Sequence, residues 1–407
     1  MTQTAAAPPS AGKTPLWTKD FVALCLSNFF MFITFYTLMT TLPLYVSETM
    51  NGSSTEMGLA VTTFVISALF IRIFAGRWVD ELGKRNMYIA SAAAYLASTL
   101  LYFAADGLLS LLLLRLVHGA SFGVITTTMA SVAADLVPDR RKAEGLGYFA
   151  LSMNLAMVLG PFLGLTLIAA ASFDSLFAIL TAVSVISLAC GLLVKFPSAK
   201  PHAVNEAAAD RPAGWRRLLE PNALPVGVSG LIVSLGYAGI IIYAPTFAAA
   251  QGYEGAGSYF FVVFAFMLVL SRPFTGRWFD TYGPHVVIYP SIALYTAGLI
   301  LLSQSYHPAL FLLSAALIGV GFGTLFPGYQ TIAVKASPAA RRGVATSTYL
   351  MMFDLGFVVG SFLLGAIASG MGVAAMFLFS AVIIAANAAV YYFLNHRRNS
   401  AAATDIP

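Results

Sequence analysis

The chain has 407 residues, of which only 10% are charged and 59% are hydrophobic. An ordinary soluble domain has about 25% charged residues, so this chain has too few to cover a soluble protein's surface. The composition argues against a soluble enzyme, a disordered chain and a nucleic-acid-binding protein, and it predicts a protein embedded in a lipid bilayer.

Twelve stretches are apolar enough to cross a bilayer as helices, each crossing taking about 20 residues. They are residues 21–46, 57–78, 86–105, 108–132, 145–170, 174–196, 223–248, 257–279, 285–305, 308–333, 343–368 and 372–395. We therefore expect an all-α membrane protein with 12 transmembrane helices arranged as two pseudo-symmetric six-helix bundles.

Polar segments divide the chain. Residues 1–20 lack the apolar core of a signal peptide, so we expect an N-terminal tail, and residues 396–407 form a matching C-terminal tail. Residues 197–222 are polar, basic and interrupted by proline. They are predicted to link one bundle, 21–196, to a second, 223–395.

The basic residues lie on one side of the predicted membrane. Of the 22 Lys and Arg residues, only Arg72, Arg115 and Arg272 fall well inside spans. The others lie at span ends or connections on one side of the membrane, or in the tails and the linker. Lys and Arg are enriched in cytoplasmic connections. This pattern predicts a multi-pass protein of the plasma (inner) membrane with both termini in the cytoplasm.

The two halves resemble each other at an offset of 200 residues. Residues 72–83, RIFAGRWVDELG, align with residues 272–283, RPFTGRWFDTYG. Both copies carry Arg, Phe, Gly, Arg, Trp, Asp and Gly at the same places. Two six-helix repeats of parallel topology are an architecture of secondary transporters.

The first copy of this repeat resembles a loop motif of the major facilitator superfamily, G-x-x-x-D-x-x-G-R-K. The matches are Gly76, Asp80, Gly83 and Arg85, with Lys84 where Arg is usual. In the second copy, which includes Asp280, Pro and His replace the two basic residues.

Two further motifs carry the resemblance. Arg115 and His118 lie in RLVHG, which is similar to the family's R-x-x-Q-G motif. Gly160, Pro161 and Gly164 match the G-P-x-x-G motif of the drug:proton antiporters. Proline removes an intrahelical hydrogen bond and bends a helix, so we interpret this motif as a helix bend without substrate contact.

The loop motif predicts a gate. We expect Asp80 to lie just past a helix end, with Arg77 and Arg85 on either side forming a charge latch that holds the halves together in one state. The alternative is a basic loop with turn glycines.

Asp354 is the only acid well inside a predicted span, and an intramembrane carboxylate is a functional candidate. The resemblance places the second and eleventh helices side by side, so we hypothesise an Arg72–Asp354 pair between the halves that loosens when Asp354 is protonated. The alternative is a permanent salt bridge. The repeat places Arg272 near Asn154.

A buried Arg115 is costly, and it could attract an anion from the cavity or bond backbone carbonyls. His118 lies one turn away on the same face; it could move a proton or be simply packed.

The resemblance implies a central cavity lined by the first, fourth, seventh and tenth helices. Its candidate substrate and proton pathway residues are Asn28, Tyr36, Arg115, His118, Tyr237, Tyr329, Gln330 and Asp354, with Phe29, Phe32, Phe35, Thr37, Thr40, Ser121, Thr126, Tyr243, Phe322 and Phe326 as further wall residues. Such aromatic walls suit an amphiphilic organic molecule better than a sugar.

We therefore predict a proton-coupled exporter of small amphiphilic compounds that works by alternating access. The alternatives are an exporter of a zwitterionic metabolite such as an opine-type metallophore, and an uptake symporter. The proton gradient would supply the energy without a cofactor, and we expect a monomer in the bilayer. The two cysteines lie in apolar runs and no enzyme motif is present, so neither a metal site nor catalysis is expected.

Overall fold

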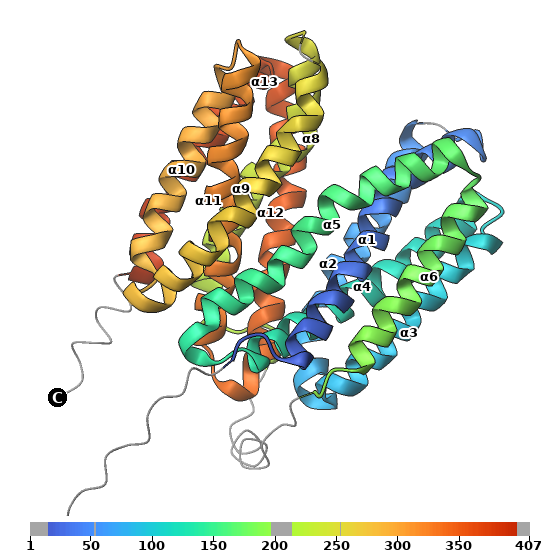
Figure 1. Ribbon diagram of the computed structural model, residues 1–407, viewed down its shortest axis with the longest axis horizontal. Helices are drawn as coiled ribbons and strands as arrows, with labels where there is room; N and C mark the ends of the chain where they lie inside the picture. The colour runs from blue at the N-terminus through green and yellow to red at the C-terminus, as the bar shows by residue number, and fades with distance from the viewer. Residues whose placement is uncertain (1–14, 53, 197–213, 253, 397–407) are drawn as a thin grey trace, which may run out of the picture.

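The computed structural model describes residues 15–52, 54–196, 214–252 and 254–396. Within these ranges the chain is helical and has 12 helices that are long and apolar enough to cross a membrane (Figure 1). The predicted all-α class and the number of spans are confirmed. The predicted tails and linker lie largely outside the described residues.

The helices of the first half are α1 (Lys19–Glu48), α2 (Ser54–Leu82), α3 (Lys84–Leu100), α4 (Leu108–Leu136), α5 (Lys142–Ala170) and α6 (Phe173–Leu192). Those of the second half are α8 (Leu224–Ala250), α9 (Glu254–Tyr282), α10 (His285–Ser303), α11 (Pro308–Lys335), α12 (Arg342–Met371) and α13 (Val373–Tyr391). Short turns of 3-10 or π helix follow or precede several of them: η1 (Leu101–Ala104), η2 (Asp139–Arg141), η3 (Gly214–Arg217), η4 (Ala339–Arg341) and η5 (Tyr392–His396).

Each half forms its own bundle. Figure 1 shows the two bundles close together at one end and diverging toward the other. We call the end where they meet the basic end; it comprises the last turns of α2, α4, α9 and α11 and the first turns of α5 and α12, and it carries Lys84, Arg141, Lys335 and Arg342. The chain enters α1 and leaves α13 on this same side of the bundles.

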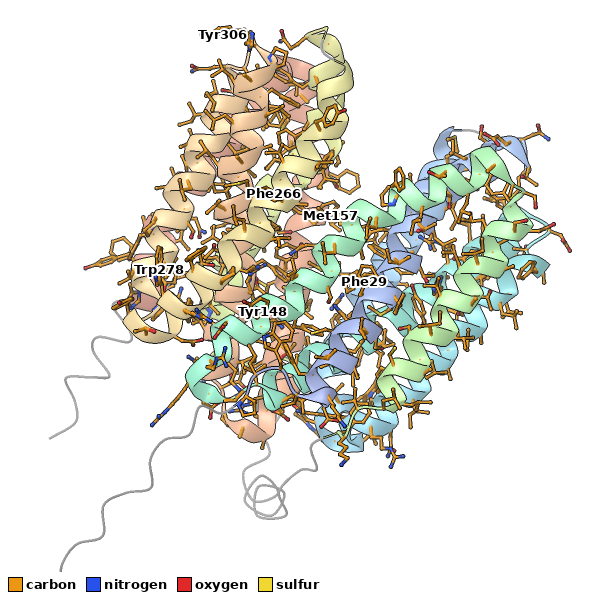
Figure 2. The ribbon with its side chains drawn as sticks, viewed as in Figure 1. Phe29, Tyr148, Met157, Phe266, Trp278 and Tyr306 are labelled. Carbon is orange, nitrogen blue, oxygen red and sulfur yellow. The ribbon has the colours of Figure 1, made fainter. Side chains whose placement is uncertain are left out.

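The outer surfaces are apolar. Phe70, Phe162, Phe266 and Phe362 each expose more than 60% of their surface, and Figure 2 shows Phe266 on the outer helices. In water such a surface would be an aggregation liability. In a bilayer it is the surface that faces lipid.

Close packing of helices within the bundles depends on small residues. A Cβ placed on Gly119 of α4 would collide with the backbone of Phe64 in α2, and one on Gly319 of α11 would collide with Phe264 in α9. The same contact therefore recurs in both halves at the offset of 200 residues. The two halves therefore share this close approach of helix backbones as well as the sequence repeat.

Helices α2 and α9 are longer than predicted. We expected the second span to end at 78, with Asp80 beyond it, but α2 continues to Leu82 and Asp80 lies in its last turn. Nothing in residues 79–82 interrupts a helix, whereas Gly83 has φ +91°, which a residue with a Cβ rarely adopts. The carboxylate is therefore held on a rigid helix rather than on a loop.

Candidate functional site

A cavity of about 470 Å³ lies between the two bundles, within the range of pockets that hold small organic ligands. Eight helices contribute to it: α1, α2, α4, α5, α8, α9, α11 and α12. Its walls are Asn28, Phe32, Phe35, Tyr36, Met39, Thr40, Phe64, Val65, Ala68, Arg72, Phe122, Thr126, Ala130, Phe149, Ala150, Met153, Met157, Pro161, Tyr237, Ile241, Phe261, Phe322, Phe326, Gln330, Leu350, Phe353, Asp354 and Phe357. Most of this lining is aromatic or aliphatic.

The uncharged polar groups of the wall are few and partly engaged. Asn28 Nδ2 donates to Ser152 Oγ at 2.7 Å. Tyr237 Oη donates to Met157 Sδ at 2.7 Å, which joins α8 to α5 across the two bundles, and Figure 2 shows Met157 where the bundles face each other. The amide nitrogen of Gln330 is buried without a partner among the described residues, so it is available to a ligand.

Among the described residues of this wall, Arg72 and Asp354 are the only charged ones. Arg72 Nε lies 2.7 Å from Asp354 Oδ2, and the two side chains are 5% and 27% exposed. The pair joins α2 to α12, and Ser347 Oγ of α12 also donates to the backbone carbonyl of Arg72. The structure thus contains the ion pair between the halves that the sequence led us to expect.

The geometry of this pair leaves donors unused. Neither Nε nor Nη1 of Arg72 makes a well-directed hydrogen bond among the described residues. A guanidinium has five N–H donors, and one carboxylate cannot use them all. Arg72 is therefore paired electrostatically but keeps hydrogen-bonding capacity at the cavity wall.

Arg115 does not reach the cavity, contrary to our expectation. Its Nε donates to the Ala60 carbonyl at 2.7 Å, its Nη1 donates to Tyr102 Oη at 3.2 Å, and its guanidinium lies 4.3 Å from the ring centre of Phe64. Arg115 is on the face of α4 that packs against α2 and η1. The alternative of bonding to backbone is the one the structure shows.

His118 and Tyr329, also predicted in the pathway, are absent from the cavity wall. His118 Nδ1 lies 3.0 Å from Tyr102 Oη, and Tyr329 Oη accepts a hydrogen bond from Asn387 Nδ2 at 3.1 Å. Both side chains are fully buried within their bundles. The faces of α4 and α11 that carry these two residues are turned toward the interior of each bundle and not toward the cavity.

Several other expected wall residues also pack elsewhere: Phe29, Thr37, Ser121 and Tyr243 do not line the cavity. Conversely, sequence reasoning did not predict the wall residues that α2, α5 and α9 contribute, including Met153, Met157 and Phe261, and from α12 it predicted Asp354 alone.

The halves also meet through a pair of equivalent caps at the basic end. Asp80 of α2 accepts hydrogen bonds from Gly343 N at 3.0 Å and Val344 N at 2.9 Å, the second and third residues of α12. In an isolated helix those donors would need an N-cap side chain, and residue 341 supplies none. Asp80 therefore caps a helix of the other bundle.

The second half repeats this arrangement. Asp280 of α9 accepts from Ala143 N at 3.2 Å and Glu144 N at 3.1 Å at the start of α5. Gly76 and Gly276 permit both contacts, because a Cβ on either would lie under 3 Å from the facing helix. Asp280 also accepts from Lys335 Nζ at 3.1 Å.

The charge latch that we expected around Asp80 is therefore wrong in its partners. Arg77 pairs with Glu81 at 2.9 Å on its own helix, and Arg85 is exposed at the start of α3. The carboxylate is held by backbone amides of the opposite bundle instead. The sequence alone could not reveal this contact, because every residue except proline has a backbone N–H and the sequence does not mark which amides bind Asp80.

Other ion pairs tie the same end. Asp135 at the end of α4 pairs with Lys84 and, at 3.3 Å, with Arg342 of the second bundle. Glu144 of α5 pairs with Arg141 at 2.7 Å and with Arg277 of the second bundle at 3.3 Å. The Arg342–Asp135 and Arg277–Glu144 pairs cross from one bundle to the other, so they join the bundles at the basic end together with the two caps.

Two bundles of six helices, related by an internal repeat and enclosing a cavity with few polar groups, define a membrane transporter of small molecules. The family model of the Major Facilitator Superfamily matches residues 24–302 and again 254–406. The chain therefore belongs to this superfamily, whose members are transporters rather than enzymes.

Known relatives agree with this assignment. The chain is 25% identical over 374 residues to the uncharacterized MFS-type transporter YhhS of Escherichia coli K12, with 89% of each chain covered. It is 27% identical over 372 residues, with 89% of each chain covered, to the protein of the same name from Salmonella enteritidis PT4.

Two solved structures share the fold. The human organic anion transporter MFSD10 (TETRAN) has a TM-score of 0.76 at 13% identity, covering 93% of this chain and 100% of that chain. FucP in the outward conformation has a TM-score of 0.73 at 15% identity, covering 94% and 100%. At such identities the likeness extends to the fold alone.

Proposed function

We propose that this protein is a proton-coupled exporter of small amphiphilic organic compounds in the plasma membrane. The basic end would face the cytoplasm, because Lys and Arg are enriched on that side of membrane proteins. The structure then represents a state closed to the cytoplasm. The bundles 21–196 and 223–395 would move as two units, and one chain would suffice because a single chain lines the cavity.

The observation that carries the proton coupling is the Arg72–Asp354 pair. It lies at the cavity wall and joins the two bundles. Two unit charges at 4 Å attract by roughly 4 kcal/mol at an effective dielectric constant of 20. Protonating Asp354 would remove that attraction, so proton binding would favour separation of α2 from α12.

The caps on α12 and α5 would act with this pair as the cytoplasmic gate. Asp80 and Asp280 hold the bundles together only while they contact the helix starts of the opposite bundle. Rocking the bundles would expose both carboxylates and both helix ends to water, where each is solvated separately. The gate is thus reversible.

The helix-bend motif is proposed to help shape the cavity. Pro161 lies inside α5 and in the cavity wall. Thr37 Oγ1 of α1 donates to the Gly160 carbonyl at 2.9 Å, and a Cβ on Gly164 would crowd the side chains of α1. The motif holds α5 against α1, so no substrate contact is required of its glycines.

The substrate class follows from the wall. Its aromatic and methionine side chains offer apolar contact, and a highly hydroxylated sugar would find few partners there. A zwitterionic metabolite remains the second candidate, because Arg72, rather than Arg115, has free donors at the wall for a carboxylate.

The test is transport by the purified chain in proteoliposomes with an imposed pH gradient. Substrates are first found by thermal-shift screening of amphiphilic compounds. Movement of substrate against its gradient, opposite to the proton flow, supports export; accumulation in the direction of proton flow establishes an uptake symporter instead.

Asp354→Asn tests the coupling. We expect this variant to retain exchange of labelled for unlabelled substrate, which needs no net proton movement, and to lose accumulation driven by the pH gradient. Full gradient-driven accumulation by Asp354→Asn would contradict the proposed proton site.

A further inference from the structure

Arg272 is a buried cation that forms no ion pair with the described residues. Its side chain is on α9 and faces α5, the residue is 3% exposed, and neither Nε nor Nη2 has a hydrogen-bond partner among the described residues. No hydrogen bond joins it to Asn154, the partner that the repeat predicted, among those described. Its equivalent in the first half, Arg72, has Asp354. An uncompensated buried charge costs several kcal/mol, so Arg272 needs a partner.

The nearby acids are already committed. Asp280 accepts from two amides of α5 and from Lys335. Glu144 pairs with Arg141 and Arg277. Neither of these carboxylates forms an ion pair with Arg272, and the described residues supply no other counter-charge to it.

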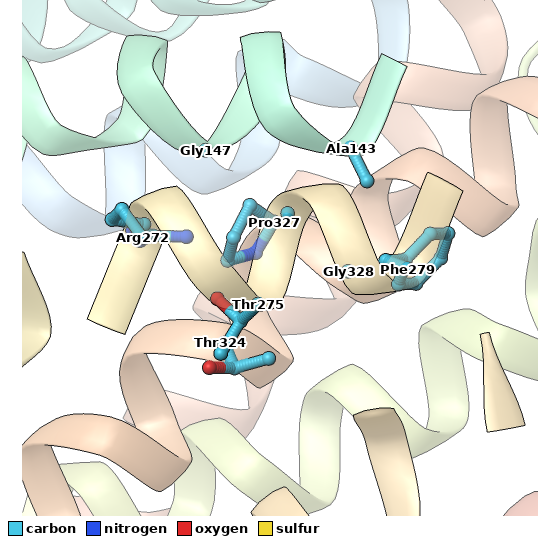
Figure 3. Close-up of a pocket in the computed structure, with 9 residues that line it drawn as sticks. Ala143, Gly147, Arg272, Thr275, Phe279, Thr324, Pro327 and Gly328 are labelled. Carbon is cyan, nitrogen blue, oxygen red and sulfur yellow. The ribbon is translucent and has the colours of Figure 1, made fainter. Parts of the chain in front are cut away.

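A small cavity adjoins the guanidinium, as Figure 3 shows. Its volume is about 10 Å³, near the smallest that accepts a single water-sized species. Arg272 and Thr275 supply donors, and no acid lines it; the remaining lining is Ala143, Gly147, Gly276, Phe279, Thr324, Pro327 and Gly328. The cavity thus combines a cation, a hydroxyl and room for a single-atom ligand.

The cavity lies between the two bundles, so a ligand bound in it would hold them together. The lining comes from α5 of the first bundle and from α9 and α11 of the second. The site therefore exists only while these helices are together at the basic end.

We propose that this cavity is a binding site for one small monatomic anion, such as chloride, which neutralises Arg272 and stabilises the closed contact between the bundles. Chloride is slightly larger than a water molecule and would need only a small shift of the lining side chains, whereas a polyatomic anion such as sulfate would need several times the space. A water molecule would fill the space without neutralising Arg272. If water alone occupied the cavity, the thermal stability of the protein would not depend on halide concentration.

The test is thermal unfolding of the purified full-length protein in detergent at constant ionic strength, with gluconate replaced stepwise by chloride, bromide or sulfate. A ligand that binds only the folded state raises the midpoint in a saturable way. We expect a rise of about 2–4 °C for chloride and bromide near 100 times the dissociation constant, and none for sulfate beyond gluconate.

Two variants localise the effect. Arg272→Gln should abolish the halide dependence. Gly147→Ala keeps the charge but places a methyl group 3.4 Å from Arg272 Cδ, an ordinary contact that fills part of the cavity, and it should weaken halide binding at least tenfold. Equal midpoints in chloride and gluconate, or a halide effect that persists in Arg272→Gln, would overturn the proposal.

Discussion

The cap that Asp80 provides to the opposite bundle can be tested by Asp80→Asn. The substitution keeps the size of the side chain and one carbonyl oxygen. It removes the negative charge and one of the two acceptors that now lie 3.0 and 2.9 Å from Gly343 N and Val344 N. The contact between α2 and α12 is weakened, while each bundle keeps its own packing.

The size of the effect follows from these contacts. A hydrogen bond to a charged group contributes about 1.5–3 kcal/mol, and a carboxylate at a helix N-terminus adds typically 0.3–1 kcal/mol. Because the two contributions together are about 1.8–4 kcal/mol and each 1.4 kcal/mol is a factor of about ten, we expect the ratio of closed to open basic ends to fall by about 20- to 700-fold. The added substitution Asp280→Asn should multiply this effect.

The assay is a distance measurement between spin labels at Leu82→Cys and Tyr282→Cys, after removal of Cys25 and Cys190. Positions 82 and 282 are equivalent ends of α2 and α9 and are 55% and 66% exposed. A longer-distance population should appear in Asp80→Asn and grow in the double variant.

Asp20→Asn is the matched control. Asp20 accepts a hydrogen bond from Lys195 N at 2.9 Å, a carboxylate–amide contact within the first bundle, so its loss should leave the distance between the bundles unchanged. If the double variant Asp80→Asn/Asp280→Asn gives the wild-type distance distribution, the caps do not hold the gate and the reasoning fails.

Three further predictions follow from contacts already described. Gly343→Ala should open the basic end like Asp80→Asn, since its Cβ would overlap the Asp80 carboxylate; an unchanged label distance would count against this. Arg115→Gln should lower stability by about 1–3 kcal/mol in thermal unfolding while leaving the substrate KM unaltered, and a raised KM would return Arg115 to the pathway. Gly119→Ala should lower the free energy of unfolding by about 1–3 kcal/mol through overpacking. Gly370→Ala, whose added methyl group meets open space, should leave it nearly unchanged. Equal thermal unfolding midpoints for the two variants would contradict the overpacking and show that α4 can shift.

The candidate site was only partly predictable. The Arg72–Asp354 pair could be anticipated because a charge inside an apolar span is rare and the family resemblance places the second and eleventh helices side by side. Arg115 was equally conspicuous, yet it bonds the Ala60 carbonyl and Tyr102. Rarity in the sequence marks a buried charge but does not say which face of the helix carries it.

The sequence by itself determined the membrane, the twelve helices and the two related halves, because these depend on the length and composition of apolar stretches and on the repeat. The tertiary structure alone decided that Asp80 and Asp280 cap helices of the opposite bundle and that no carboxylate of the described residues pairs with Arg272. Backbone amides are the same at every residue, and helix rotation follows from packing between distant segments, so neither leaves a mark in the order of residues.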